Sequence, residues 1–554
     1  MEARPCQISE FFNGTKQLLV PLFQRPYEWG SREWQSLWDD LLEQYERSEE
    51  DTLASHFTGA VVTAPAKSVP VGVSKYLVID GQQRLTTVAI LITSIRSFFD
   101  RHTPKYRKLT RLLVNEDDDG LDYFKLLPTQ PDRSAFQGLV QQSPVLGTRF
   151  TQAYEFFRQK LSSTDSDGVA IDLERLSDAV QTRLTVVAIH LGDVDDPYLI
   201  FESLNAKGAP LTQADLIRNY LLLRLHSNDQ QTAYETAWLP MQSLLSGDHL
   251  TEFMRHFLML SGDEVAKSAI YSVLKRRLLN VEDSSVFAEL QRMERSSVLY
   301  AQIVGLTQCP DEDIARGLER LRRWDISTAN TLILKMLERY REGATDAKDI
   351  SDCLQIIESF AVRRQVCAVP TNQLKRIFIS SAKDVPESGI AHWLGNMLAS
   401  GSSGRRWPKD DEFMQGLLRY RAYAQPLDRC KFLLEAIEHA AGHKEPAAFH
   451  SATIEHIMPQ TLTAEWNEML GPSFVTIHER WLDLLPNLTL TAYNSELSNS
   501  PFAVKRTLLA DSHFELNKWV SARQNWTEYD LEQRAGALFE VAKDIWRGPI
   551  QQGQ

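Results

Sequence analysis

The sequence has few cysteines, and they are not arranged for a bridge or a metal. Five occur among 554 residues and none forms a CxxC pair: Cys6, Cys309, Cys353, Cys367 and Cys430. This scatter excludes the usual zinc-knuckle spacing and gives no disulfide framework. We therefore expect reduced thiols in the core or at the surface.

Long apolar runs and excess positive charge are also missing. No apolar run approaches about 18 residues, and the N-terminus lacks the basic, apolar and small-residue order of a signal peptide. We therefore expect a soluble, cytoplasmic protein with no membrane partner. The formal net charge is −13. A protein that coats DNA non-specifically is basic overall, so any DNA contact here must come from local patches.

The length and composition are those of a globular protein with several domains. At 554 residues the chain exceeds what one hydrophobic core usually serves, so two or three domains are expected. The hydrophobic fraction of 43% and charged fraction of 24% argue against extensive disorder.

The most informative stretch is 76–87, YLVIDGQQRLTT. Its first four residues form an apolar run typical of a buried strand, which Asp80 and Gly81 end. Apolar residues then recur at helical spacing, which predicts an amphipathic helix: Leu85, Val88, Ile92, Ile95 and Phe99. The turn between strand and helix carries a carboxylate, two amides and a guanidinium: Asp80, Gly81, Gln82, Gln83 and Arg84.

This turn has the outline of a phosphate site. Backbone N–H groups point outward where a helix begins, and the helix dipole favours an anion there. Ordinary turn chemistry is the alternative. Asp accepts backbone N–H bonds, Gly allows positive φ, and an Arg in the first turn can be a plain surface residue.

A proline-held loop precedes this stretch. Residues 18–29, LLVPLFQRPYEW, begin as a strand that Pro21 and Pro26 interrupt. Its aromatic, amide and guanidinium groups are candidates for gripping a base or a phosphate: Gln24, Arg25, Tyr27 and Trp29. The equally weighted alternative is that Tyr27 and Trp29 pack the loop onto the next helix.

Further strands and one helix start are expected in the N-terminal part. Residues 56–63 and 183–190 are rich in β-branched residues. Thr212 and Asp215 have capping-box spacing, so a helix is expected after residue 211. The polar loop before it contains Asn205, Lys207 and Gly208, which turn chemistry alone also explains.

From about 226 to 390 the spacing is helical and strand alternation is absent. An arginine-rich run lies within it, which is more often a solvated face paired with acids than a phosphate track: Arg316, Arg320, Arg322 and Arg323. Residues 401–404, GSSG, followed by RRWPKDD, are the best candidate for a flexible loop or linker.

A second candidate site lies near the C-terminus. His456 sits in the short β-like segment IEHIMPQ, directly after Glu455. Asn487 follows 31 residues later and Asn494 seven residues after that. A His, a turn Asn and a helix-borne Asn outline an HNH (ββα-metal) nuclease site, although the spacing alone is loose. One surface acid and one buried, hydrogen-bonded histidine is the alternative.

Both ends of the chain resemble one family. DGQQRLTT, the QR-x-Y-x-W loop and FE-x-LN-x-x-G with DLIRN resemble the ParB-like N-terminal domain of the GmrSD family of modification-dependent restriction enzymes. EHIMPQ, Trp466, PNLTLT and the NSELSNSPF segment ending at Lys505 resemble that family's C-terminal HNH domain. The family usually has Gly where this chain has Pro486, which stiffens the turn before Asn487.

The resemblance implies a role for each motif. It implies nucleotide binding and hydrolysis, with GTP as the expected triphosphate, by Asp80, Gly81, Gln82, Gln83 and Arg84, and DNA sensing by Gln24, Arg25, Tyr27 and Trp29. His456 would be the general base, and Asn487 would hold its loop. Glu455 and Asn494 would bind one Mg²⁺ or Mn²⁺, and Lys505 would contact a phosphate. His478 and Asn499 are possible substitutes.

We therefore expect an α+β, predominantly helical protein: a ParB-like α/β domain at 1–225, a helical domain at 226–400 and an HNH domain embedded in helices at 401–554. The expected function is a nucleotide-regulated, modification-dependent DNA endonuclease acting in antiviral defence, with modified DNA and a nucleoside triphosphate as partners. A ParB-like nucleotide switch with an inactive C-terminal domain is the alternative, and an indiscriminate DNA-degrading toxin is a third. Which modification is sensed, and whether the chain forms a homo-oligomer, are left open.

Overall fold

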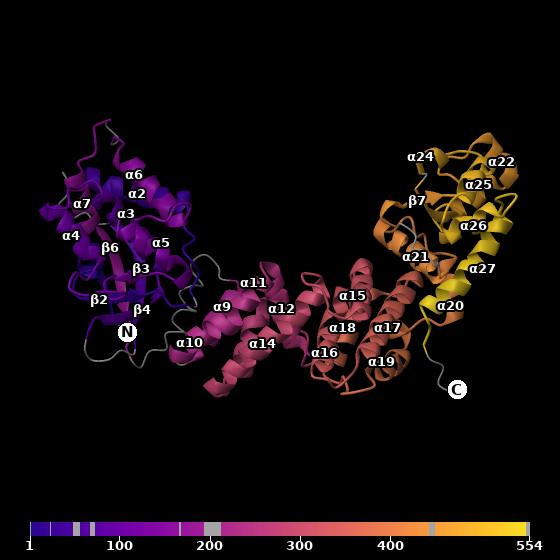
Figure 1. Ribbon diagram of the computed structural model, residues 1–554, viewed down its shortest axis with the longest axis horizontal. Helices are drawn as coiled ribbons and strands as arrows, with labels where there is room; N and C mark the ends of the chain where they lie inside the picture. Colours follow the sequence, from indigo (N-terminus) through magenta and orange to yellow (C-terminus); the bar gives the residue numbers. More distant parts are fainter. Residues whose placement is uncertain are drawn as a thin grey trace. The chain divides into compact units, whose positions relative to one another are not determined.

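The chain forms two compact units in a computed structural model. Residues 2–22, 24–47, 56–66, 72–164, 168–192, 212–225, 227–442, 449–492 and 494–549 are described. Unit 1 consists of Met1–Pro240 and Leu274–Gln291, and unit 2 consists of Met241–Val273 and Arg292–Gln554; the residue colours of Figure 1 locate these ranges. The expected α+β, predominantly helical fold class is confirmed. The division into three domains stays a prediction.

Unit 1 is built on a mixed sheet with the described strand order β1-β6-β3-β4-β2-β5. The strands are β1 (Glu2–Gln7), β2 (Lys16–Leu19), β3 (His56–Pro65), β4 (Ser74–Asp80), β5 (Leu126–Leu127) and β6 (Leu184–His190). The β3–β6, β2–β4 and β2–β5 pairs are parallel, and β1–β6 and β3–β4 are antiparallel. The strands expected near 56–63, 76–79 and 183–190 are therefore confirmed.

Helices surround α3 (Gln82–Arg96), which follows β4 directly (Figure 1). They are α2 (Ser31–Arg47), α4 (Pro104–Leu113), α5 (Gln130–Val140), α6 (Arg149–Leu161) and α7 (Leu173–Thr182). The expectation that α3 is amphipathic is wrong, because every residue from Leu85 to Arg96 is buried. Its polar residues fit this environment because Thr93 and Ser94 donate to carbonyls one turn earlier.

The helix expected after residue 211 is present as α9 (Gln213–Arg224). Thr212 and Asp215 form the predicted capping box, with each side chain accepting the other's backbone N–H. Arg218 pairs with Asp215 at 2.9 Å. Asn205, Lys207 and Gly208 lie outside the described residues.

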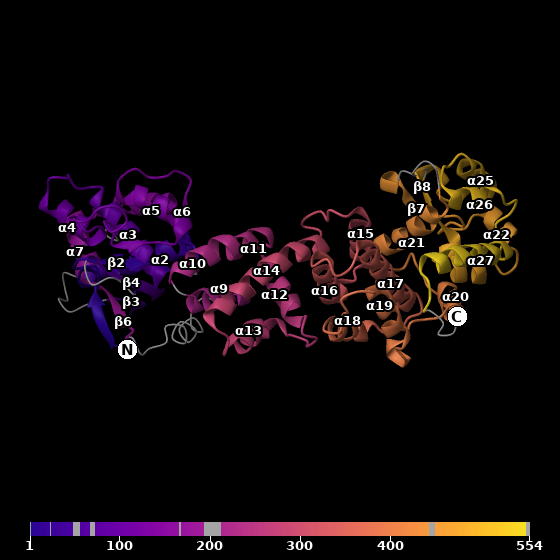
Figure 2. The ribbon, with the colours of Figure 1, turned by 60° about the horizontal axis from the view of Figure 1, so that its bottom comes forward.

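The described part of unit 2 begins as a stack of helices, as the sequence predicts (Figure 2). These are α12 (Asp248–Met259), the part of α14 (Asp283–Val304) from Arg292 onward, α15 (Glu312–Trp324), α16 (Asn330–Arg341), α17 (Ala347–Val366), α18 (Leu374–Ala382) and α19 (Ile390–Ala399). Two residues of the arginine run pair with buried acids: Arg320 with Glu358 and Arg323 with Glu435, both at 2.6 Å. The pairing with acids is as expected, but these two acids are buried and belong to other helices, so the two arginines do not form a purely solvated face.

The GSSG segment at 401–404 is tied down, so its interpretation as a flexible linker is wrong. The guanidinium of Arg364, which is buried, donates to the carbonyls of Gly404 and Arg406. Among the described residues no carboxylate pairs with this guanidinium, so these bonds satisfy its donors and hold the segment against α17.

The C-terminal part of unit 2 encloses a two-stranded hairpin. β7 (Thr453–His456) pairs antiparallel with β8 (Leu488–Thr491), which places His456 opposite Leu488. Around the hairpin lie α20 (Asp410–Leu417), α21 (Leu427–Ala440), α22 (Ala464–Leu470), α23 (Phe474–Trp481), α24 (Asn494–Leu497), α25 (Phe502–Ala510), α26 (Glu515–Ser521) and α27 (Glu528–Ile545). Trp466, Trp481 and Trp526 fill the core beside it.

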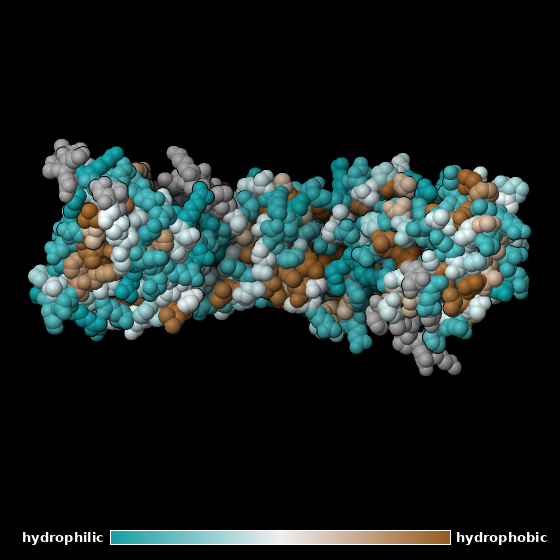
Figure 3. Space-filling model, turned by 90° about the horizontal axis from the view of Figure 1, so that it is seen from above, coloured by the Kyte–Doolittle hydropathy of each residue, from teal (hydrophilic) through white to brown (hydrophobic). Residues whose placement is uncertain are grey.

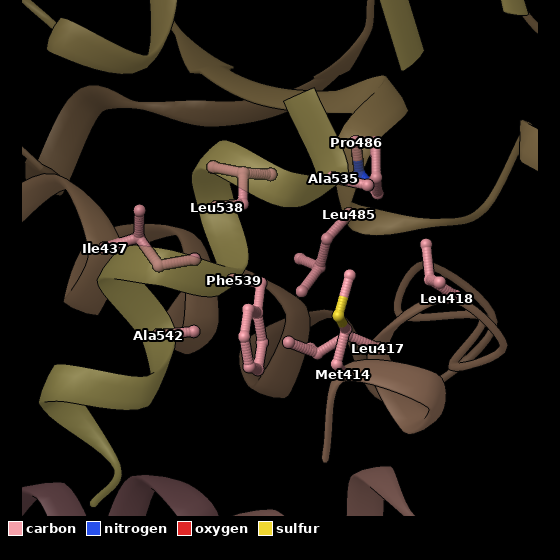
Figure 4. Close-up of a pocket in the computed structure, with 10 residues that line it drawn as sticks. All are labelled: Met414, Leu417, Leu418, Ile437, Leu485, Pro486, Ala535, Leu538, Phe539 and Ala542. Carbon is pink, nitrogen blue, oxygen red and sulfur yellow. The ribbon is translucent and has the colours of Figure 1, made fainter. Parts of the chain in front are cut away.

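Behind the turn before Asn487 lies a small apolar cavity of about 20 Å³. Figure 4 shows Leu485 and Phe539 pointing toward it, with Met414 and Leu417 on the opposite side. Space for about one water, without polar partners, makes this a packing defect.

The surface shown in Figure 3 is mostly hydrophilic, with separate hydrophobic patches. Among the described residues, no helix is long and apolar enough to cross a bilayer.

Candidate functional site

The β4–α3 turn requires glycine at its centre. Gly81 has φ of 90°, and a Cβ there would lie 2.9 Å from the Ala60 carbonyl oxygen. Leu85 N–H donates to the Gly81 carbonyl and closes the first turn of α3. Strand β4 therefore passes into the helix within one residue, as the sequence predicts.

The two glutamines of the turn bind the proline-held loop. Gln82 Nε2 donates to Gln24 Oε1 at 3.2 Å and to the Arg25 carbonyl at 3.1 Å. Gln83 Oε1 accepts the Glu28 and Trp29 N–H groups, and its Nε2 donates to the Pro26 carbonyl. Both amides predicted to bind nucleotide thus hold the 24–29 loop onto α3.

The loop itself is partly buried. Gln24 is 8% exposed and donates to the Ile79 carbonyl, and Tyr27 is 6% exposed. The Tyr27 hydroxyl accepts from Trp34 Nε1 and hydrogen-bonds Thr87. For Tyr27 the packing interpretation is correct, and direct stacking on DNA is excluded in this arrangement. Arg25 and Trp29 keep partial exposure.

Arg84 is the residue of the turn that reaches open space. Its guanidinium donates to the Ala60 carbonyl at 2.6 Å and lies against the bare Cα of Gly59. Burial lowers the pKa of Arg84, against the opposing effect of Asp80. The side chain stays cationic because its ordinary pKa is far above neutral.

Arg84 lines an open cavity of about 240 Å³. The other walls come from one stripe of α2, the loop and the start of β3, and include Trp29, Glu33, Asp40, His56 and Phe57. Asp40 Oδ2 lies 3.3 Å from His56 Nε2. This cavity is the candidate ligand site of unit 1.

Substituting Gly59 with alanine is expected to displace Arg84. The new Cβ would lie 2.5 Å from Arg84 Cζ, and φ is +119°. Arg84 is the guanidinium of the cavity, so the affinity for a nucleoside triphosphate, the ligand that the sequence predicts, should fall about tenfold or more, as for a lost charged hydrogen bond. Titration calorimetry measures it. Gly72→Ala is the matched control, because Gly72 has φ of +114° and a Cβ there would meet no atom within 4 Å. Equal losses of nucleotide affinity in the two variants would show that displacement of Arg84 is not the cause.

In unit 2, His456 ends β7 and is buried, with 7% exposure. The Tyr423 ring packs edge-to-face on the imidazole with centroids 4.3 Å apart. Asp483 Oδ1 lies 3.9 Å from His456 Nε2, which is too far for a hydrogen bond. Nε2 has no hydrogen-bond partner among the described residues. Burial lowers the pKa of His456 to about 4, so the imidazole is neutral at pH 7.

Asn487 holds the His456 loop in the manner expected. Its Oδ1 accepts the Met458 N–H at 2.8 Å, and its Nδ2 donates to the Met458 and Leu482 carbonyls. Ile457 N–H donates to the Asn487 carbonyl. The two sequence motifs thus meet two residues after the histidine. Pro486 does not prevent this, because it sits in the 3₁₀ turn Leu485–Asn487 that presents the amide.

Glu455 and Lys505 do not occupy the positions predicted for them. Lys505 is fully buried; Nζ lies 2.6 Å from Glu455 Oε1 and donates to the His456 carbonyl at 2.7 Å. The Lys505 amine is thus used by Glu455 and the His456 carbonyl in this arrangement, and its role as a phosphate contact stays a prediction. Burial raises the pKa of Glu455 and lowers that of Lys505, while each partner's charge opposes the shift.

The donors around His456 do not fit a bound Mg²⁺ or Mn²⁺ in this arrangement. The Glu455 carboxylate is occupied by an ammonium group, and the described residues contain no cluster of three or more potential His, Cys, Asp or Glu ligands. Asn494 begins α24, but its side chain lies outside the described part. His478, one of the substitutes, is held by the Pro459 carbonyl at 2.9 Å.

Unit 2 is expected to lose stability as the pH falls from about 6.5 to about 4. Burial lowers the pKa of both His256 and His456 to about 4. In that window the unfolded chain binds protons that the folded chain does not, so stability present above pH 6.5 is progressively lost. For His456 the loss approaches about 3 kcal/mol. Urea unfolding at pH 7 and 5 measures it, and an unchanged pH dependence in His256→Gln/His456→Gln would contradict it.

Some residues of the two sites escape a sequence search. Asp483 and Tyr423 approach His456 from outside the motif, and Gly59 makes room for Arg84 across the sheet. No short spacing connects any of them to its partner. For Asp483 alone the sequence gives a weak indication, because it lies four residues before Asn487 in the segment 483–486, DLLP.

Two family models match the chain. The family model for the GmrSD restriction endonuclease N-terminal domain matches residues 8–222. The model for the GmrSD restriction endonuclease C-terminal domain matches residues 407–541. No curated protein matches the chain. The first match contains the β4–α3 turn with its loop, and the second contains the His456–Asn487 hairpin, so the chain belongs to the GmrSD family of restriction endonucleases.

Proposed function

We propose that the protein is a nucleotide-regulated, modification-dependent DNA endonuclease of antiviral defence. Unit 1 binds and hydrolyses a nucleoside triphosphate, with GTP as the first candidate, and senses modified DNA. The hairpin of unit 2 cuts the DNA by an HNH-type reaction. A cytoplasmic location follows from this role.

The observation that carries the nuclease assignment is the His456–Asn487 arrangement. The asparagine side chain makes two hydrogen bonds to the backbone of Met458, two residues after the histidine, and a third to the Leu482 carbonyl. The imidazole is neutral at pH 7, and its buried Nε2 has no hydrogen-bond partner among the described residues, so the protein does not use the lone pair that would accept a proton. Such a base removes a proton from the water that attacks a phosphodiester.

The nucleotide assignment is supported by the cavity beside Arg84. A cation faces open space next to the Asp80 carboxylate, and the two glutamines fix the wall of the cavity. Arg84 suits a phosphate oxygen because a guanidinium donates two parallel N–H bonds. Asp80 and Arg84 are therefore the residues to test in this turn.

The test is cleavage of a panel of differently modified DNAs, with and without each nucleoside triphosphate. Mg²⁺, Mn²⁺ and EDTA are compared in parallel, which tests the expected cation requirement. Cleavage of one modified DNA is expected to depend on nucleotide and to be lost in Asp80→Asn. Asp117→Asn, on an exposed residue, is the matched charge control. Equal cleavage with and without nucleotide, and by the Asp80→Asn variant, would overturn the proposed nucleotide regulation.

One observation favours the second candidate, a nucleotide-dependent DNA-binding switch with an inactive C-terminal domain. His456 is buried, and the carboxylate beside it is neutralised by Lys505. Under this alternative, plasmid stays intact under every condition, and His456→Ala changes nothing. A toxin, by contrast, would cut unmodified DNA as readily as modified DNA.

A further inference from the structure

The cavity beside Arg84 has a lining suited to a nucleobase. Trp29 and Phe57 both line it, and Phe57 is 56% exposed although it lies in a strand. A large aromatic side chain left in solvent beside a cavity is available for stacking, which every base supports through its π-face. The stripe of α2 with Glu33, Ser36 and Asp40 supplies polar groups to the same space.

The charges inside the cavity decide which part of a nucleotide it suits. Glu33 and Asp40 are carboxylates, and like charge disfavours a phosphate beside them. Glu33 Oε2 accepts the Gly30 N–H at 2.9 Å, and Asp40 Oδ2 lies 3.3 Å from His56 Nε2. The second oxygen of each carboxylate is left to accept N–H bonds of the kind that amino-bearing bases present along their edges. Arg84 also lines the cavity, and its guanidinium is charged at neutral pH. A phosphate is therefore favoured at the end of the cavity where Arg84 lies.

The geometry of the β4–α3 turn also positions the walls of this cavity. Gln83 accepts the N–H groups of Glu28 and Trp29, which fixes the backbone that carries the Trp29 side chain. Arg149 donates to the Glu28 carbonyl at 2.8 Å and braces the same loop from α6. The turn thus contributes one wall directly, through Arg84, and a second wall indirectly, through Trp29.

We propose that this cavity is a nucleobase subsite that takes an amino-bearing base, with stacking on Phe57 and Trp29 and its N–H edge toward Asp40 and Glu33. Its volume of about 240 Å³ accommodates a base with part of its sugar and leaves the phosphates outside, beside Arg84. The base comes from a free nucleotide or from a nucleotide extruded from DNA. The inference rests on the proposed nucleotide control of this unit.

The first experiment measures binding of free ligands to the full-length chain by titration calorimetry. The probes are GTP, UTP, which lacks an amino group, and inorganic tripolyphosphate, which lacks a base. GTP is expected to bind more tightly than UTP. Phe57→Ala and Asp40→Asn are each expected to lower the affinity for GTP roughly tenfold and to leave the affinity for tripolyphosphate unchanged.

Matched controls come from neighbouring positions. Leu146→Ala removes an exposed apolar side chain that does not line the cavity, and Asp39→Asn removes the adjacent carboxylate on α2. Both should bind GTP as the natural chain does. The second arm uses a duplex with an unpaired 2-aminopurine opposite an abasic site, which reports extrusion by its fluorescence. If this duplex competes with GTP for the natural chain and the competition is lost in Phe57→Ala, the cavity takes a base extruded from DNA.

The outcomes separate the subsite from the proposed function. If Phe57→Ala and Asp40→Asn bind GTP and the 2-aminopurine duplex normally while Asp80→Asn does not respond to nucleotide, the subsite is overturned and nucleotide control stands. If the natural chain binds neither nucleotide nor extruded base, both fail. Loss of GTP affinity in the two cavity variants, with tripolyphosphate unaffected, supports the subsite.

Discussion

Replacing His456 with alanine is expected to lower DNA cleavage by about 10²- to 10⁴-fold, the usual contribution of a positioned general base. The imidazole is neutral at pH 7 and its Nε2 accepts no hydrogen bond from the described residues, so its proton-accepting atom is unoccupied. Plasmid nicking, measured with the DNA and nucleotide that support wild-type cleavage, gives the rate.

The same variant separates chemistry from folding. Asn487 bonds the backbone of Met458 and Leu482 and makes no bond to the imidazole, so the hairpin should survive the loss of the ring. His513→Ala, on an exposed histidine of the same region, is the matched control and should cut normally. A His456→Ala chain that folds, binds nucleotide and still cuts DNA at the natural rate would remove His456 from the reaction.

Local patterns predicted the parts of the fold that depend on neighbouring residues. The β4–α3 turn follows from an apolar run broken by Asp80 and Gly81, and the start of α9 follows from Thr212 and Asp215. Backbone conformation at such places is set by a few adjacent residues. A short stretch of sequence is therefore enough to predict where such a strand ends or a helix begins.

Residues whose partners lie far along the chain were predicted less well. Gln82 and Gln83 bond a loop 54 to 58 residues away, and Tyr27 bonds Thr87 across 60 residues. An amide or hydroxyl is chemically able to bind a ligand or to bind the protein, and the residue type does not distinguish the two. The burial of α3 on all sides was missed for a similar reason, because Thr and Ser satisfy their hydroxyls within the helix.

Replacing Lys505 with methionine is expected to destabilise unit 2 by about 3 to 5 kcal/mol, because it leaves the Glu455 charge buried without a partner. The double variant Glu455→Gln/Lys505→Met should recover most of that loss, since it removes both charges. Urea unfolding of the full chain measures the free energy. Lys518→Met, which breaks an exposed pair with Glu515, should cost about 1 kcal/mol or less.

The result also decides what Lys505 does during the reaction. A buried ion pair beside His456 is either a permanent brace of the hairpin or a contact that opens to release Glu455 and Lys505 for catalysis. A permanent brace predicts that the double variant regains both stability and cleavage. If the double variant regains stability but neither binds nor cuts DNA, the pair must separate in the working state. Lys505 would then act on a phosphate, as its place in the sequence motif suggests.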